Sequence, residues 1–272
     1  MKYLSLFITL LLIGFSQNVF AAKLALKGTP IQGGVLFGQT DPGCEVEYEA
    51  MLVKVGEDGT FVIGFRPDQP AWAVLRTRCP DGSRRRQFLQ IEQREYPEQH
   101  IDGLPPKMVT PDEETQARIK AEAIRVRAAR ETQSDMQAFR DPFIWPVRGT
   151  VTGLFGARRV LNGEPRSPHY AVDIAADTGT PVMATAAGKV IFAEDLYLSG
   201  KTVIIDHGHG LSSSYLHLDS ISVAIGEEVE QGQTVATVGA TGRVTGAHLD
   251  WRFNWFQVRL DPELVAGPMP AE

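Results

Sequence analysis

The stretch His169-Tyr170-Ala171-Val172-Asp173 decides the fold of this chain when it is combined with two later segments, Tyr215-Leu216-His217-Leu218 and His248-Leu249-Asp250-Trp251. Side chains on a strand repeat every two residues. The histidine and aspartate of the first stretch are four residues apart, and those of the last segment are two apart. Each pair is therefore expected to point to one face of a strand. Together with the histidine of the middle segment, the two pairs are enough to bind one metal ion and to leave groups for proton transfer.

The region around these segments, from Phe143 to about Glu263, is predicted to be a β-sandwich or β-roll. Runs such as Gly188–Phe192 and Lys201–Ile205 are short and either apolar or alternating, and glycine occurs at nearly every turn. The sequence contains no phosphate loop, dinucleotide fingerprint or Gly-x-Ser-x-Gly motif. Combined with the histidines and Asp173, the lack of these motifs makes metal-assisted hydrolysis on a mostly β fold the leading hypothesis.

Five of the six histidines lie in this region, and this clustering is the strongest functional signal in the composition. The six are His100, His169, His207, His209, His217 and His248. A single histidine on a strand is more often packed or at the surface than a metal ligand, so the histidines count only as a set with Asp173. We expect His207, His209 and the adjacent Asp206 to be structural or surface residues, and His100 to lie at the surface.

The segment from about Gly149 to Asp261 resembles a lysostaphin-type (LytM-like) zinc metallopeptidase domain. That family carries His-x-x-x-Asp early and His-x-His late, with a His-Leu strand between them. The matching residues are His169 and Asp173, then Tyr215–Leu218, then Gly246–Asp250, with Gly179–Val182, Ala186–Gly188 and Gly232-Gln233 also in order. The resemblance implies a β-sheet groove, one Zn²⁺ ion and cleavage of peptide bonds in peptidoglycan.

Carried over by position, the resemblance implies that His169, Asp173 and Asp250 bind the zinc ion. His217 and His248 would flank the attacking water as general base and transition-state stabiliser. Three protein ligands leave one position open, and zinc polarises a carbonyl and acidifies water. A histidine can accept the released proton at neutral pH.

The sequence departs from the family pattern at two positions. Ala171 stands where glycine is usual, which is a small change if the backbone there permits a Cβ atom. Asp250 stands where the second histidine of His-x-His is usual. A carboxylate still binds zinc, but two carboxylates are expected to lower the Lewis acidity of the ion. The site is therefore predicted to bind a divalent metal, with slower hydrolysis or a preference for a harder ion such as Mn²⁺.

Residues 23–103 are predicted to form a small antiparallel β domain, because strand-like runs alternate with turns such as Gly56–Thr60. Cys44 and Cys79 are the only cysteines, and in an exported chain they are expected to form a disulfide; two separate buried thiols are the alternative. The run Arg84–Arg86 is expected at a solvated hairpin tip.

Residues 110–141 are predicted to contain one long linker helix that extends to Arg140. Thr110 would cap it, Pro111 would take the first helical position and Glu113 would complete a capping box. Its thin apolar stripe, Ile119, Ala123, Val126 and Arg130, predicts a mostly solvated helix. A partner-binding helix is the alternative. The second β domain then spans 143–272.

Residues 1–21 are predicted to be a cleaved secretory signal peptide. A short positive start, the apolar run Leu4–Phe15 and the small residues before position 22 fit this assignment, and the run is too short for a comfortable membrane span. An uncleaved anchor is the alternative. The formal charge of −6 and pI of about 5.6 argue against a nucleic-acid-binding protein. We expect a periplasmic protein that acts on peptidoglycan.

Two classes of function follow. The first is an exported metallo-endopeptidase of peptidoglycan. The second is a degenerate, non-catalytic module of the same fold that binds cell wall or regulates another cell-wall hydrolase. Four of the five family positions are retained and the fifth is a competent ligand type, which favours the enzyme. A lipoyl-type carrier is disfavoured, because no lysine occupies the required hairpin tip.

Overall fold

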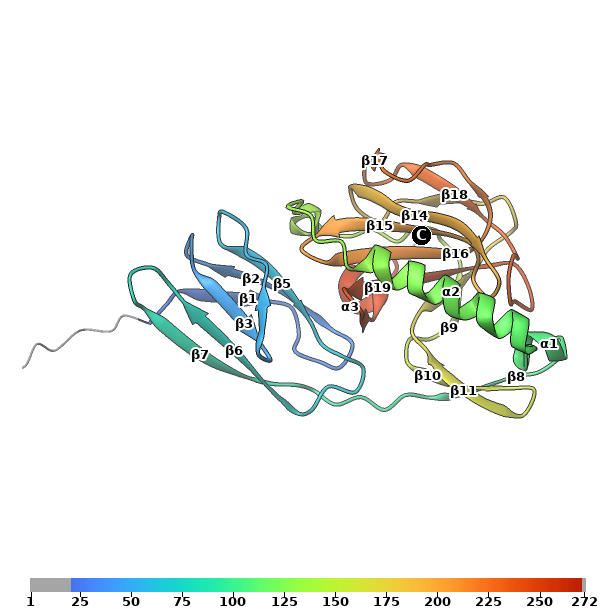
Figure 1. Cartoon of the computed structure of the whole chain (residues 1–272), viewed down its shortest axis with the longest axis horizontal. Helices are drawn as coiled ribbons and strands as arrows, with labels where there is room; N and C mark the ends of the chain where they lie inside the picture. Colours follow the sequence, from blue (N-terminus) through green and yellow to red (C-terminus); the bar gives the residue numbers. More distant parts are fainter. Residues whose placement is uncertain (1–20, 271–272) are drawn as a thin grey trace, which may run out of the picture.

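The computed structural model describes residues 21–270, and the predicted signal peptide lies outside these residues apart from Ala21. The chain is mostly β, as predicted, with two β-rich halves and one long helix (Figure 1). Within residues 21–270, no helix combines the length and apolarity needed to cross a membrane.

The N-terminal half consists of two small antiparallel sheets. One has the order β1-β2-β5 and the other the order β4-β3-β6-β7. The strands are β1 (Leu24–Lys27), β2 (Val35–Thr40), β3 (Glu45–Tyr48), β4 (Met51–Val53), β5 (Thr60–Gly64), β6 (Trp72–Arg78) and β7 (Arg84–Gln90). Burial alternates along β6, so one face of its sheet packs inward and the other faces solvent.

A disulfide joins Cys44 and Cys79, which confirms the predicted pairing. The bridge closes a loop with a sequence separation of 35 and links the residue before β3 to the residue after β6. In the chain-entropy model, a loop of this length corresponds to about 3–4 kcal/mol of stabilisation.

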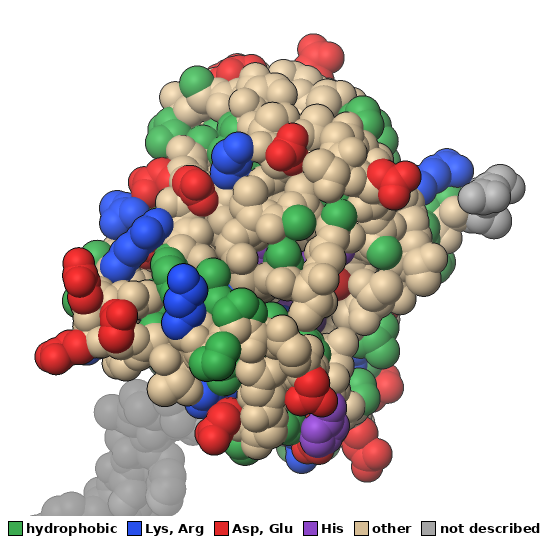
Figure 2. All heavy atoms as spheres, turned by 90° about the vertical axis from the view of Figure 1, so that its right-hand side faces the viewer, with side chains coloured by type: hydrophobic (Ala, Val, Ile, Leu, Met, Phe, Trp, Pro, Cys, Tyr) green, Lys and Arg blue, Asp and Glu red, His purple; other side chains and the backbone are tan. Residues whose placement is uncertain are grey.

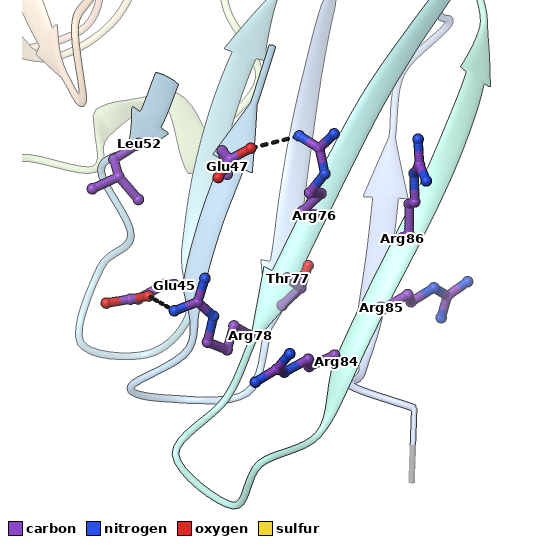
Figure 3. Close-up of a pocket in the computed structure, with 9 residues that line it drawn as sticks. All are labelled: Glu45, Glu47, Leu52, Arg76, Thr77, Arg78, Arg84, Arg85 and Arg86. Atoms are coloured by element: carbon purple, nitrogen blue, oxygen red, sulfur yellow. Dashed lines mark hydrogen bonds and ion pairs between the residues drawn. The ribbon is translucent and has the colours of Figure 1, made fainter. Parts of the chain in front are cut away.

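The prediction for Arg84–Arg86 is wrong, because these residues lie in β7 rather than at a hairpin tip. Arg86 pairs with Arg76 and Arg84 pairs with Arg78 across the sheet. Figure 3 shows the result: arginines of two strands gather on one solvent-facing surface, and Glu45 and Glu47 reach only those of β6. The tip lies instead at Asp81-Gly82, where the glycine adopts φ +83°.

The segment between the halves contains β8 (Glu98–Ile101), α1 (Pro106–Val109), α2 (Glu113–Arg130) and the 3₁₀ turn η1 (Ala138–Arg140). The predicted capping is wrong: Asp112 rather than Thr110 caps α2, accepting a hydrogen bond from the Thr115 N–H at 2.8 Å. The helix also ends ten residues earlier than predicted. After the helix ends, the Ser134 hydroxyl donates a hydrogen bond of 2.5 Å to Asp206 of β15. The chain here makes tertiary contacts instead of continuing the helical hydrogen bonds.

The α2 helix lies along the sheet of the second half (Figure 1). The predicted stripe faces this sheet, since Ile119, Ala123, Val126 and Arg130 share a cavity wall with Leu196 and Ile204. Arg125 also binds Glu194 at 2.8 Å. The opposite side of the helix is solvated, as its sequence predicts.

The second half is built on a ten-stranded sheet whose main path is β17-β14-β15-β16-β19-β12-β9. Its strands are β9 (Thr150–Gly153), β12 (Val172–Ala175), β13 (Pro181–Met183), β14 (Gly188–Leu196), β15 (Gly200–Gly208), β16 (Leu211–Ile221), β17 (Glu228–Val229), β18 (Thr234–Val238), β19 (His248–Trp255) and β20 (Val258–Leu260). The short helix α3 (Pro262–Ala266) follows. The central strands β15 and β16 are almost wholly buried. The apolar run Val203–Ile205 explains the burial of β15, whereas β16 also buries the three serines Ser212–Ser214.

A separate three-stranded sheet lies beside it, in the order β11-β10-β8, with β10 (Ala157–Leu161) and β11 (Glu164–His169) forming a hairpin. β8 pairs in parallel with β10, so Glu98–Ile101 belongs structurally to the second half. The two halves share one apolar core, in which the Tyr48 and Trp255 rings lie 6.0 Å apart. Arg94 and Asp261 form an ion pair of 2.8 Å across the same boundary.

Candidate functional site

Two carboxylates face each other at the centre of the site. β12 and β19 are antiparallel neighbours, and their register places Asp173 directly opposite Asp250. Both are buried, with exposed fractions of 7% and 2%. Like charges directly opposite one another destabilise a sheet, and burial increases the cost. This position therefore requires cations nearby.

His169 completes a compact group of three donors. It ends β11, and the chain bends at Tyr170-Ala171 before β12 begins, so His169 and Asp173 do not share one continuous strand as expected. The bend still brings their side chains together: His169 Nε2 lies 3.1 Å from Asp173 Oδ1 and 3.3 Å from Asp250 Oδ2. Ala171 is buried without a left-handed backbone, so its Cβ atom is accommodated.

The other two histidines lie beside this group. His217 Nε2 is 4.0 Å from Asp250 Oδ2, and His248 Nε2 is 3.9 Å from Asp173 Oδ1. Their Nδ1 atoms bond the carbonyl oxygens of Thr241 at 2.8 Å and Gly246 at 2.9 Å. A carbonyl can only accept, so each Nδ1 donates a hydrogen, and in a neutral ring the Nε2 is then the acceptor that faces the site.

The backbone of His217 adopts φ +63° within β16, a left-handed conformation that is rare for a non-glycine residue. The pairing register of β16 shifts just beyond it, between Leu218 and Ser220. Strain of this kind concentrates at functional sites, where the surrounding structure holds a side chain in place.

Burial and close charged contacts compete to set the charge states of these groups. It lowers the pKa of His217 to about 4, and the nearby Asp250 charge only partly offsets it, so the ring is neutral at pH 7. Burial opposes the charges of His169 and Asp250, but the contacts of His169 with Asp173 and Asp250, and of Asp250 with Arg252, prevail. The pKa of His169 is raised as a result, and that of Asp250 lies well below its ordinary value.

The three donors fit a zinc ion. His169, Asp173 and Asp250 each offer one ligand atom, and these atoms lie within 4.8 Å of one another. Zinc bonds of about 2.0–2.2 Å in a tetrahedron place donor atoms roughly 3.3–3.5 Å apart, close to the spacing of His169 from the two aspartates. Asp173 Oδ1 is buried and has no hydrogen-bond partner among the described residues, as expected of a ligand atom.

Two arginines neutralise the carboxylates, and neither belongs to the residues expected at the site from the sequence. Arg252 donates two hydrogen bonds of 2.6 Å to Asp250, and Arg159 donates one of 2.9 Å to Asp173. Arg252 follows Asp250 by two residues on β19, so strand periodicity could have identified it. Arg159 comes from β10, and only the folded structure brings it to the site.

A cavity of about 170 Å³ opens onto the site, lined by Asp173, His217 and His248 and covered in part by Ile101 and Leu104 of the connecting segment. Figure 2 views the molecule from the side of α1, and histidine side chains are visible at the bottom of a hollow near the middle of this face.

The remaining histidines lie outside the group, as expected. His207 is fully buried and bonds Ala187 O and Ser213 Oγ, both at 2.8 Å. His209 is buried against Phe139. His100 is exposed beside Glu98.

Comparison with known proteins relates this region of the chain to a peptidase family. The sequence profile of peptidase family M23 matches residues 167–262. Two curated relatives are the peptidoglycan DD-endopeptidase ShyC of Vibrio cholerae, 37% identical over 120 residues, and the murein hydrolase activator EnvC of Escherichia coli, 39% identical over 131 residues. These alignments cover 43% and 48% of this chain but only 28% and 29% of the relatives.

Among solved structures, a Pseudomonas aeruginosa protein assigned to peptidase M23 matches with a TM-score of 0.64 at 29% identity. That match covers 88% of this chain and 96% of the other. Both halves of the present fold therefore have a counterpart in one solved protein.

Proposed function

Because this chain belongs to peptidase family M23, we propose that it is an exported, metal-dependent endopeptidase that hydrolyses peptide bonds of peptidoglycan, in the stem peptide or the cross-link. One observation carries the proposal: the donor atoms of His169, Asp173 and Asp250 converge within 4.8 Å at a buried position that a cavity reaches.

In this proposal the three converging residues hold one Zn²⁺ ion or another divalent metal. When bound, the ion polarises the scissile carbonyl and acidifies water. His217 and His248 supply the proton transfer and transition-state contacts, because their Nε2 atoms lie 4.0 Å from Asp250 Oδ2 and 3.9 Å from Asp173 Oδ1. Their Nδ1 bonds to backbone carbonyls hold both rings in that orientation.

The other parts of the chain are assigned from their sequence. Residues 1–21 export the protein, 23–103 form an accessory β domain, 110–141 a linker and 143–272 the metallopeptidase domain. The periplasm is the proposed location, and the Cys44–Cys79 disulfide supports an oxidising compartment. Peptidoglycan is the proposed partner.

The test is digestion of purified peptidoglycan by zinc-loaded protein, with and without a chelator, with released fragments identified by mass. The variant H169A should lose both stoichiometric zinc and fragment release. H100A, which removes an exposed histidine, should lose neither. Release that persists in chelator, or no release at all from protein that holds zinc, would contradict the proposal.

One observation favours a second candidate. Arg252 and Arg159 already pair with the two carboxylates and offset their charge, so the site is also stable as a network of ion pairs. The chain would then be a non-catalytic module that binds cell wall or regulates another cell-wall hydrolase. Failure to retain zinc, combined with stimulation of a second hydrolase by the same preparation, would favour this candidate.

A further inference from the structure

A second cavity, of about 480 Å³, adjoins the candidate metal site and is lined by five arginines. We call it the arginine pocket, and its arginines are Arg159, Arg166, Arg243, Arg252 and Arg259. They come from β10, β11, the loop before β19, β19 and β20, so the fold gathers them from separate parts of the chain. His169 lies in the wall of this pocket as well as in the metal group.

Three of these charges have no acidic partner among the described residues. Arg166 bonds the Val109 carbonyl at 3.0 Å, and Arg243 bonds the Met108 carbonyl at 3.3 Å. Arg259 bonds the Asn254 side-chain oxygen at 3.2 Å. All three partners are neutral, so these contacts satisfy hydrogen bonds without offsetting charge.

The arginines also act on one another. Burial lowers the pKa of Arg259 to about 10, and the neighbouring Arg252 charge adds to the effect. Burial lowers the pKa of Arg243 too, with Arg159 and Arg166 as further causes. Partly buried like charges cost stability unless an opposite charge joins them. This repulsion among arginines occurs at a cavity that is open to a ligand.

The pocket also has unused donors. The Nε atoms of Arg159 and Arg166 are buried and have no hydrogen-bond partner within the described part of the chain. Guanidinium groups bind carboxylates in a planar, two-bond geometry, so a cluster of arginines with uncompensated charge matches a carboxylate ligand.

We propose that the arginine pocket binds free carboxylates of the peptide substrate and holds them next to the scissile bond. This assignment rests on the proposed function, and it narrows the substrate to peptides that carry carboxylates beside the cleaved bond. The shared wall at His169 places the anion next to the candidate metal ligands. A cavity of this size accommodates a short peptide segment but excludes a membrane surface.

The test measures binding by calorimetry with protein that has been stripped of metal and then freed of chelator, so that cleavage does not interfere and no carboxylate chelator competes. The probes are the stem tetrapeptide L-Ala-γ-D-Glu-meso-diaminopimelate-D-Ala and the same peptide with its carboxylates amidated. Wild-type protein should bind the acid form about tenfold or more tightly than the amide form, the size of one charge-assisted hydrogen bond. The variant R243Q/R259Q should lose that preference, because neither arginine touches a candidate metal ligand.

Two controls separate charge from folding. R259K keeps the charge and should keep most of the preference. K120Q/R127Q removes two exposed positive charges from α2 and should leave binding of both peptides unchanged.

Equal binding of acid and amide forms by wild-type protein would overturn the proposal, as would R243Q/R259Q with an unchanged preference. Inorganic phosphate bound more tightly than the acid peptide would also overturn it. Acid-selective binding without peptidoglycan hydrolysis would contradict the proposed function alone.

Discussion

Replacing Arg252 by methionine should destabilise the metal-free protein and strengthen its zinc binding. The substitution removes two hydrogen bonds of 2.6 Å from Asp250, a carboxylate that is 2% exposed. Removing one partner of a buried ion pair costs about 3–5 kcal/mol. Since the Arg252 side chain is 23% exposed, we expect the lower end of that range.

The expected loss of about 3 kcal/mol corresponds to a fall in Tm of roughly 6–12 °C for a chain of this size. Zinc should reverse most of it. The freed Asp250 carboxylate becomes fully available as a ligand, and a positive charge close to the ion is removed, a change of several kcal/mol at an effective dielectric constant of about 20. The zinc dissociation constant should therefore fall at least tenfold. At 100 times that constant, bound zinc adds about 2.7 kcal/mol of stability.

Thermal unfolding in chelator and in saturating zinc, with zinc affinity from calorimetry, checks this reasoning. The chain offers a matched control in the Arg94–Asp261 pair, where the distance is 2.8 Å and the side chains are 24% and 2% exposed. R94M should be destabilised to a similar extent but should not be rescued by zinc beyond the wild-type shift. If R252M were equally unstable with and without zinc and bound it no better, Asp250 would not be a ligand.

Three further perturbations test other parts of the structure. Burial lowers the pKa of His207 from 6.5 to about 4, so the unfolded chain binds a proton that the folded one excludes between these pH values, and stability should fall as the pH falls. In H207N, the free energy of unfolding measured in urea should fall less on acidification than in the wild type. The difference between the two losses should reach about 3 kcal/mol at pH 4. The variant C44A/C79A should lose about 3–4 kcal/mol of unfolding free energy, and reductant should then have no further effect. R84Q/R86Q removes two like-charge pairs from β6 and β7 and should raise Tm by a few degrees; a lower Tm would show that these arginines stabilise the sheet (Figure 3).

Local patterns in the sequence predicted the features that depend on local rules. Alternation and turn residues indicated the mostly β fold, and the two cysteines indicated the disulfide. The long helix was recognised from its composition, but its end was not, because the contacts of Ser134 that follow Arg130 come from a distant strand. The arginine run was misplaced for a similar reason: charge suggested a loop, whereas pairing with β6 made it a strand.

The sequence singled out the five residues that the fold brings together, but not how they are arranged. Spacing alone suggested that His169 and Asp173 share a strand face, whereas a bend between two strands brings them together. The direct opposition of Asp173 and Asp250 depends on the register of β12 and β19, which are far apart in sequence. The contact of Arg159 with Asp173 likewise depends on tertiary structure.

The pair Asp250–Arg252 alters the expected cost of having aspartate at position 250, where the family pattern has histidine. A second carboxylate alone would add negative charge to the ligand set and weaken the Lewis acidity of zinc. Here Arg252 cancels that charge within 2.6 Å, so the pair is neutral overall, like the histidine that the family pattern carries, and it still offers one oxygen to the centre. Arg159 adds a further positive charge beside Asp173. The ion would therefore keep its acidity, and the cost of the substitution falls on metal affinity, because zinc must share both carboxylates with guanidinium groups.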